Sequence, residues 1–125
     1  EQKSGAIINF GSVSGMFGYP YEIGYGSSKA AVIYMTKNAA NENGFNGVRI
    51  NAVSPGWVDT NMMKTVVDSY KDVGIENSSD NVTIGPMRRV AAPEELANVV
   101  TFLASEEASY VNGANFLVDG GMTLG

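Results

Sequence analysis

Short apolar runs bounded by glycine or proline alternate with longer runs of helical periodicity along this chain of 125 residues. The apolar runs cover residues 5–11, 48–54 and 114–121, and their length and β-branched content favour buried strands. Helical patterns lie between them, at residues 25–42 and 92–105. This order predicts an α/β fold, with βαβ units in a parallel sheet, right-handed crossovers and flanking helices.

The helix expected at residues 25–42 has apolar side chains around most of its circumference, so we expect burial on more than one side, with Gly44 ending it. The helix at residues 92–105 has clearer local signals. Pro93 suits its first position, and the two glutamates that follow suit the positive end of the helix dipole.

A shorter amphipathic pattern at residues 62–70 leads into a polar stretch at residues 74–86. Because few apolar residues would anchor the polar part, we interpret residues 60–86 as a flap.

Composition limits the chemistry that is open to this chain. It has no cysteine and no histidine, which excludes thiolate nucleophiles, imidazole bases and nearly every zinc site, so we predict no metal. A net charge of −5 with eight basic residues argues against a nucleic-acid partner. The apolar runs are too short to span a membrane and no secretory pattern opens the chain, so we expect no membrane partner and a cytoplasmic location.

Polar residues cluster where ligands of a parallel sheet bind, beyond the carboxyl ends of the strands. Ser12 follows the first expected strand, the Pro55–Gly56 turn follows the second, and Asp119 lies near the end of the third. Tyr25 and Lys29, in the stretch YGSSK, are four residues apart and would share one helix face.

Taken in order, the stretches IINFGSVSG, YGSSK, VRINAVSPGWVDT and VNGANFLVDGG resemble the carboxyl-terminal half of a short-chain dehydrogenase/reductase. The resemblance covers nearly the whole chain. It implies that residues 1–125 form the carboxyl-terminal portion of a single Rossmann-like domain, part of a doubly wound parallel sheet, whose amino-terminal dinucleotide-binding half is absent. The family's glycine-rich turn and catalytic asparagine have no counterpart here, so we expect the chain by itself to bind NAD(P) very weakly.

The resemblance implies an NAD(P)-dependent oxidoreductase that transfers hydride between nicotinamide and a secondary alcohol or ketone. Tyr25 would be the acid/base. A free phenol has a pKa of about 10 and is therefore a poor base at neutral pH. A nearby cation such as Lys29 favours the phenolate. Lys29 would also bind the nicotinamide ribose, and Ser12 would polarise the substrate oxygen. Ser14 is the rival for that role, and a turn or cap is the plain alternative for Ser12.

The same resemblance assigns cofactor contacts to Pro55, Gly56, Val58 and Thr60, in addition to Tyr25 and Lys29, with NAD or NADP left open. Thr60 as a helix N-cap is the structural alternative. The flap at residues 60–86 would bind the substrate.

Other residues have mainly structural interpretations. Asn9 and Asn51 lie within expected strands, where hydrogen bonding inside the fold is the better explanation. For the apolar side chains Trp57, Met62 and Met63, lining a substrate pocket and packing are equally good explanations.

The expected helix at residues 25–42 is apolar around most of its circumference, which predicts a homo-oligomer, a dimer or tetramer. In it, Ile33, Tyr34 and Lys37, or neighbours on that side, would approach their own copies. A non-catalytic module that only oligomerises is the alternative function. Halohydrin dehalogenation is less favoured, since the relatives that perform it resemble this pattern with arginine where Lys29 stands.

Overall fold

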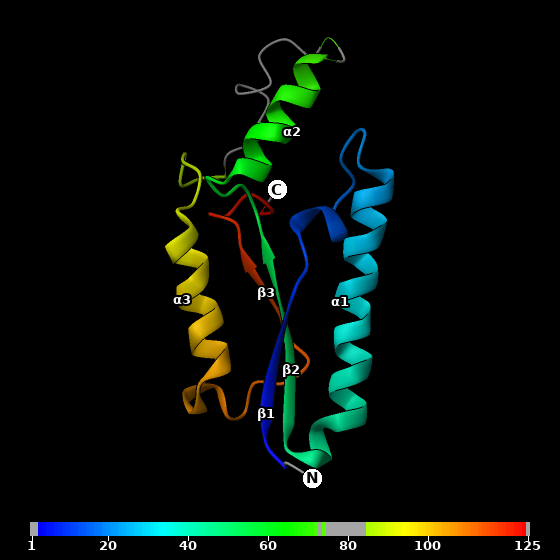
Figure 1. Ribbon diagram of the computed structural model, residues 1–125, viewed down its shortest axis with the longest axis vertical. Helices are drawn as coiled ribbons and strands as arrows, with labels where there is room; N and C mark the ends of the chain where they lie inside the picture. The colour runs from blue at the N-terminus through cyan, green and yellow to red at the C-terminus, as the bar shows by residue number, and fades with distance from the viewer. Residues whose placement is uncertain (1–2, 73, 75–84, 125) are drawn as a thin grey trace.

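The computed structural model describes residues 3–72, 74 and 85–124. Three parallel strands form one sheet in the order β1 (Gly5–Phe10), β2 (Val48–Pro55) and β3 (Asn115–Val118). All three therefore end at the same edge of the sheet, the upper edge in Figure 1. The α/β fold and the parallel sheet expected from the sequence are confirmed.

Three α-helices accompany the sheet: α1 (Ile23–Asn43), α2 (Asn61–Asp72) and α3 (Pro93–Ala104). Short 3₁₀ turns follow β1, α1 and α3, at η1 (Val13–Gly15), η2 (Gly44–Asn46) and η3 (Glu106–Ala108). Gly44 is the C-cap of α1 and Pro93 opens α3, as expected. Of the predicted flap, residues 73 and 75–84 lie outside the described residues. Within the described part of the chain, no helix has the length and apolarity needed to cross a membrane.

Helices α1 and α3 cover opposite faces of the sheet (Figure 1). Adjacent residues of β1 show this, because Asn9 hydrogen-bonds Thr36 on α1 whereas Ile8 packs on the core cluster that contains Leu103 of α3. The chain nevertheless advances in the same direction across the sheet at both connections. The two crossovers therefore have opposite hands, and the expectation of right-handed crossovers is wrong for one of them. The connection from β2 to β3, residues 56–114, is long enough for the chain to change faces.

The third strand is shorter than its apolar run, residues 114–121, had indicated. It ends at Val118, after which Gly120 and Gly121 take positive φ angles of 62° and 81° and form a turn. The Asp119 carboxylate stabilises the turn by accepting hydrogen bonds from the Gly121 N–H (2.9 Å) and from the Thr123 hydroxyl (2.7 Å). Burial acts to raise the pKa of Asp119, but these hydrogen bonds outweigh it and the pKa is lowered.

The main apolar core lies between α3 and the sheet. Val53, Leu103 and Ala108 are fully buried there. A valine or leucine side chain contributes roughly 1.5–3 kcal/mol when it is removed from water. The core thus fixes α3 against β2 and leaves the carboxyl edge of the sheet to the polar residues.

Asn9 and Asn51 are hydrogen-bonded inside the fold, as expected. The Asn9 side chain donates to the Thr36 hydroxyl at 2.9 Å. The Asn51 side chain, 1% exposed, donates to the Val111 carbonyl (2.9 Å) and accepts from the Ala114 N–H (3.0 Å). It therefore satisfies the backbone of the segment that enters β3.

Asn112 connects three parts of the fold. Its side-chain oxygen accepts from the Ile50 N–H at 2.8 Å, and its amide donates to the Ala40 carbonyl at 3.1 Å. Gly113 then donates to the Ile50 carbonyl at 2.9 Å. The segment before β3 thereby holds the end of α1 and the start of β2 together.

Candidate active site

Ser12 lies two residues beyond the end of β1 and is buried, with 7% of its surface exposed. Its hydroxyl oxygen accepts a hydrogen bond from the Ser14 N–H at 3.1 Å and so caps the 3₁₀ turn η1. A serine hydroxyl has two acceptor positions and one donor. The cap uses one acceptor position, so capping and substrate binding are compatible at Ser12.

Tyr25 and Lys29 meet on α1 as their spacing predicts. The Lys29 ammonium nitrogen lies 5.6 Å from the centroid of the Tyr25 ring. It also donates to the carbonyl oxygen of Phe10, the last residue of β1, at 3.0 Å. Lys29 therefore sits between the tyrosine and the carboxyl end of the sheet, where a cation would stabilise a phenolate.

Two glycines that the sequence analysis did not assign bring the serine turn against α1. A Cβ at Gly26 would lie 2.7 Å from the Ser14 carbonyl oxygen, and one at Gly15 would lie 2.7 Å from the Lys29 carbonyl carbon. Backbone atoms block both positions, so any side chain would force the segments apart. The available signal was the position of Gly26 inside YGSSK itself.

Four of the six residues assigned to the cofactor lie at the end of β2 and in the turn that follows it. Pro55 pairs with Val118 of β3, and the Gly56 N–H donates to the Val118 carbonyl at 3.1 Å. Val58 forms a bridge to Ala91. These contacts hold the turn at the carboxyl edge of the sheet, on the side of β2 that faces β3.

Thr60 performs the capping role that was its structural alternative. Its hydroxyl group accepts from the Met63 N–H at 3.3 Å through its oxygen and donates its hydrogen to the Val58 carbonyl at 3.4 Å. Both bonds are long, and Thr60 is exposed. The hydroxyl therefore remains accessible to a ligand while it caps α2.

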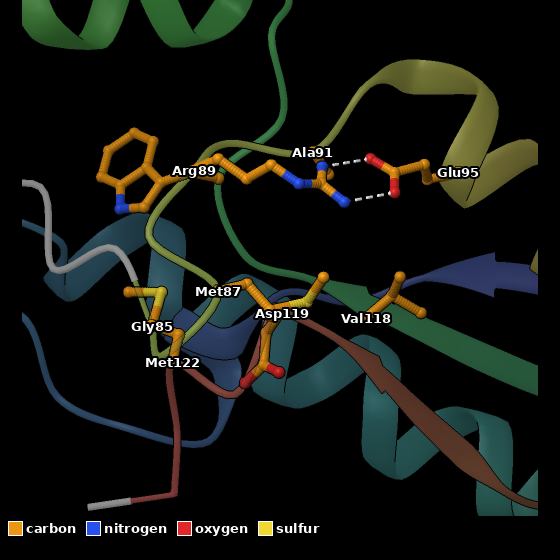
Figure 2. A pocket seen from close by; sticks show the side chains of 10 residues that line it. Gly85, Met87, Arg89, Ala91, Glu95, Val118, Asp119 and Met122 are labelled. Carbon is orange, nitrogen blue, oxygen red and sulfur yellow. Dashed lines mark hydrogen bonds and ion pairs between the residues drawn. The ribbon is translucent and has the colours of Figure 1, made fainter.

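A small cavity of about 80 Å³ lies beyond β3 and contains none of the three predicted catalytic side chains (Figure 2). Trp57, Met87, Arg89 and Asp119 are among its lining residues. The Trp57 indole nitrogen is buried and has no hydrogen-bond partner among the described residues. Trp57 thus lines a small cavity, and its two explanations, packing and lining a substrate pocket, both stay predictions.

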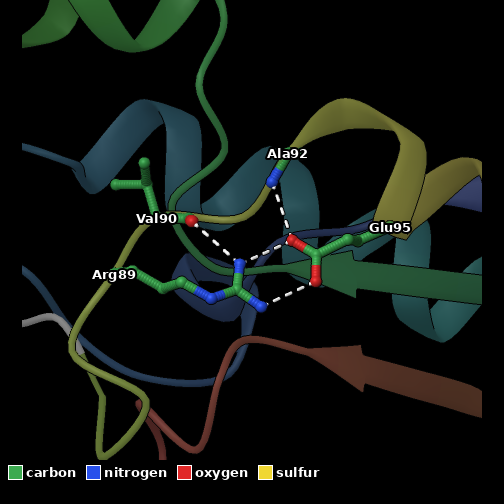
Figure 3. A network of polar contacts seen from close by, with 4 residues as sticks. All are labelled: Arg89, Val90, Ala92 and Glu95. Atoms are coloured by element: carbon green, nitrogen blue, oxygen red, sulfur yellow. Dashed lines mark hydrogen bonds and ion pairs between the residues drawn. The ribbon is translucent and has the colours of Figure 1, made fainter.

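The cavity wall includes an ion pair that fastens the segment before α3 to the first turn of that helix (Figure 3). Arg89 donates twice to the Glu95 carboxylate, at 2.6 and 2.7 Å, and the Ala92 N–H donates to the same carboxylate at 2.9 Å. Hydrogen bonds from Arg89 and from the Ala92 N–H lower the pKa of Glu95 to about 2. The pair is structural, because it closes the start of α3.

Comparison with known proteins agrees with this geometry. A family model described as enoyl-(acyl carrier protein) reductase matches residues 1–123. The chain is 45% identical over 121 residues to the short-chain dehydrogenase fogB of Aspergillus ruber, covering 96% of this chain and 42% of that protein. The chain belongs to the short-chain dehydrogenase/reductase family. It is also 38% identical over 124 residues to the 3-oxoacyl-(acyl-carrier-protein) reductase FabG of Thermotoga maritima, covering 99% of this chain and 48% of that one.

Solved structures of this short-chain dehydrogenase/reductase family share the fold. Levodione reductase superposes with a TM-score of 0.92 at 35% identity, over 98% of this chain and 48% of that one. L-sorbose reductase from Gluconobacter frateurii, complexed with NADPH and L-sorbose, gives a TM-score of 0.83 at 35% identity, over 97% and 48%. The Rossmann-like fold class is thereby confirmed. The chain spans about half the length of the curated relatives it matches.

Proposed function

We propose that this chain is the catalytic half of an NAD(P)-dependent oxidoreductase that interconverts a secondary alcohol and a ketone. The observation that carries the proposal is the position of the Lys29 ammonium, 5.6 Å from the Tyr25 ring and hydrogen-bonded to the end of β1. Ser12 lies two residues beyond that strand end, so an acid/base, a cation and a hydroxyl lie near one edge of the sheet. The membership of the family supports the same reaction class.

In the proposed reaction, Tyr25 exchanges a proton with the substrate oxygen. In the reducing direction its hydroxyl donates the proton and becomes a phenolate, which the positive charge of Lys29 stabilises. The bond to the Phe10 carbonyl uses one of the three donors of the Lys29 ammonium and holds it in place. The Ser12 hydroxyl orients the substrate oxygen.

The donor groups present fit the nicotinamide end of a dinucleotide. An ammonium at Lys29, a hydroxyl at Thr60 and the backbone at Val58 are suited to a ribose and a carboxamide. When bound, the nicotinamide supplies or accepts the hydride. The sequence has no glycine-rich turn of the kind that binds a pyrophosphate. That part of the cofactor would be held by residues outside these 125.

We further propose that residues outside these 125 continue the sheet along β1. This strand is at the edge of the described sheet, and Ile7 and Phe10 on it are each 48% exposed. An edge strand with large exposed apolar side chains is suited to pairing with a further strand. Such an extension would complete a single Rossmann-like domain of which residues 1–125 are the carboxyl-terminal portion.

The substrate class rests on the relatives, which are named for the reduction of a 3-oxoacyl group, of levodione and of L-sorbose. A test uses the complete protein that carries this segment with one ketone from each of these classes, following the absorbance of reduced nicotinamide. Tyr25→Phe should lower turnover by ~10²- to 10⁴-fold with nearly unchanged cofactor affinity. Tyr110→Phe, at a fully exposed tyrosine, is the matched control and should be as active as wild type. A Tyr25→Phe variant with near-normal turnover would refute the assignment.

We also propose that the protein is a homo-oligomer. Tyr34 and Met35 on α1 are 67% and 54% exposed and provide an apolar surface. Ile33, which was expected near its own copy, is instead 8% exposed and packs inside the chain beside Gly11 and Gly15. The surface of α1 that we propose contacts a second copy therefore includes Tyr34 and not Ile33. Sedimentation at micromolar concentration should show a dimer or tetramer, and a monomeric species alone would refute this.

A further inference from the structure

Helix α2 rises from the carboxyl edge of the sheet and stands apart from α1 and α3 (Figure 1). None of its side chains is fully buried. Near its far end, the Tyr70 hydroxyl donates to the Glu22 carboxylate at 3.3 Å. Glu22 is the residue immediately before α1, three positions ahead of Tyr25. The contact therefore joins α2 to the start of the helix that holds the proposed acid/base.

The surroundings of Glu22 are unusual for a carboxylate. One carboxylate oxygen, Oε2, is buried without a hydrogen-bond partner among the described residues. Burial and the charge of Glu22 raise the pKa values of both Tyr70 and Tyr19. A buried, unpaired carboxylate oxygen is unfavourable unless something compensates its charge. Among the described residues, the Tyr70 hydroxyl is the donor that compensates the carboxylate, through its other oxygen.

One side of α2 carries apolar side chains that are partly shielded from solvent, the pattern expected of a helix face that packs on other groups. Met63, Val66, Val67 and Tyr70 follow helical spacing and are all half-buried, whereas Met62 is 59% exposed. Since Tyr70 belongs to this set, the bond to Glu22 determines which way the set faces. The apolar side of α2 is therefore held facing the start of α1.

We propose that Glu22 and Tyr70 are positioning residues that hold α2 at the start of α1, so that Met63 and Val66 form a wall against the apolar part of a ketone substrate. This inference rests on the proposed oxidoreductase function. Neither residue takes part in proton or hydride transfer. Their loss should therefore weaken substrate binding more than it slows the chemical step.

The kinetic test uses the complete protein. Tyr70→Phe removes only the hydroxyl, and Glu22→Ala removes the acceptor. Each should raise the KM for the ketone about threefold to tenfold, the effect of losing one hydrogen bond, with kcat, the KM for the cofactor and the melting temperature nearly unchanged. Glu22→Gln keeps an oxygen acceptor and should behave as wild type. Tyr110→Phe, at a fully exposed tyrosine near the opposite edge of the sheet, is the matched control.

A double variant separates a direct contact from two independent effects. If Tyr70 and Glu22 act through their shared bond, Tyr70→Phe combined with Glu22→Ala should be no worse than the more severe single variant. Effects that multiply in the double variant would overturn the proposal.

Hydrogen exchange tests the contact without any turnover. The amides of residues 61–72 should exchange faster in Tyr70→Phe and Glu22→Ala, and those of α3 should not change. Unchanged exchange over α2 would overturn the proposal whatever the kinetics, and so would faster exchange with an unchanged ketone KM. No turnover in the wild-type protein, together with faster exchange in the variants, would refute the oxidoreductase function and with it the substrate wall, but would support the positioning contact.

Discussion

Gly24 and Gly26 lie two residues apart at the start of α1 and should respond oppositely to the same substitution. A Cβ at Gly26 would lie 2.7 Å from the Ser14 carbonyl oxygen, whereas a Cβ at Gly24 would meet nothing within 4 Å. Both residues lie within α1 and neither has a positive φ angle. Gly24→Ala and Gly26→Ala therefore differ mainly in one contact.

The expected magnitudes follow from that difference. Replacing an exposed helical glycine by alanine stabilises a protein by about 0.4–1 kcal/mol, chiefly because the unfolded chain has fewer conformations. Gly24→Ala should show this gain. Gly26→Ala has the same gain, but the new methyl group must displace the backbone at Ser14, and overpacking of this kind costs about 1–3 kcal/mol. The free energy of unfolding should thus be about 1–3 kcal/mol lower for Gly26→Ala than for Gly24→Ala.

Urea unfolding followed by circular dichroism measures this difference directly. Activity gives a second readout, because moving the Ser14 backbone also shifts Ser12 relative to Tyr25. Gly26→Ala should lose turnover, and Gly24→Ala should keep it. Equal stability of the two variants would show that the contact between η1 and α1 is not what brings the serine and the tyrosine together.

Three further predictions concern the remaining contacts. Asn51→Ala leaves two backbone groups unpaired and should lower the free energy of unfolding by about 1–3 kcal/mol for each of them. A total loss below about 1 kcal/mol in urea unfolding would contradict this. The hydrogen bond from Arg89 lowers the pKa of Glu95 from 4.5 to about 2 in the folded protein, so the stability that this pair contributes is complete above pH 4.5 and is lost as the pH falls toward 2. Thermal unfolding of Glu95→Gln should therefore depend less on pH in that window than the wild type does, and parallel curves would argue against the pair with Arg89. The 125 residues alone should bind NAD(P) very weakly, because the pyrophosphate would lack helix-terminal donors; micromolar binding in isothermal titration would disprove this.

Much of the fold could be predicted because local patterns determine it. The glycine-bounded apolar runs identified all three strands, and Pro93 marked the start of α3. The hand of the second crossover could not be predicted, because it depends on which face of the sheet α3 occupies. The end of β3 was misplaced for a different reason: Asp119 and the two glycines after it form a turn whose hydrogen bonds involve Thr123, beyond the apolar run.

The candidate site was predictable where spacing within one helix was sufficient, as at Tyr25 and Lys29. The close approach of Gly26 to the Ser14 carbonyl oxygen could not be predicted, since it joins Gly26 to a backbone atom of a neighbouring segment. The bond between Glu22 and Tyr70 spans 48 residues and has no local signal in either residue. Contacts of this kind arise only from tertiary structure, and they are the ones that place α2.

The order in which the chain can fold follows from Asn112. Its side chain satisfies the Ile50 N–H, 62 residues earlier, and the Ala40 carbonyl, 72 residues earlier. The Ile50 N–H points to the side of β2 that faces β3 and must remain hydrated until the segment before β3 arrives, so that side of β2 is unpaired during early folding. Contacts between residues so far apart form slowly. In a pulse-labelled refolding experiment, the Ile50 amide should therefore gain protection together with residues 113–116 and later than the amides in the middle of α1.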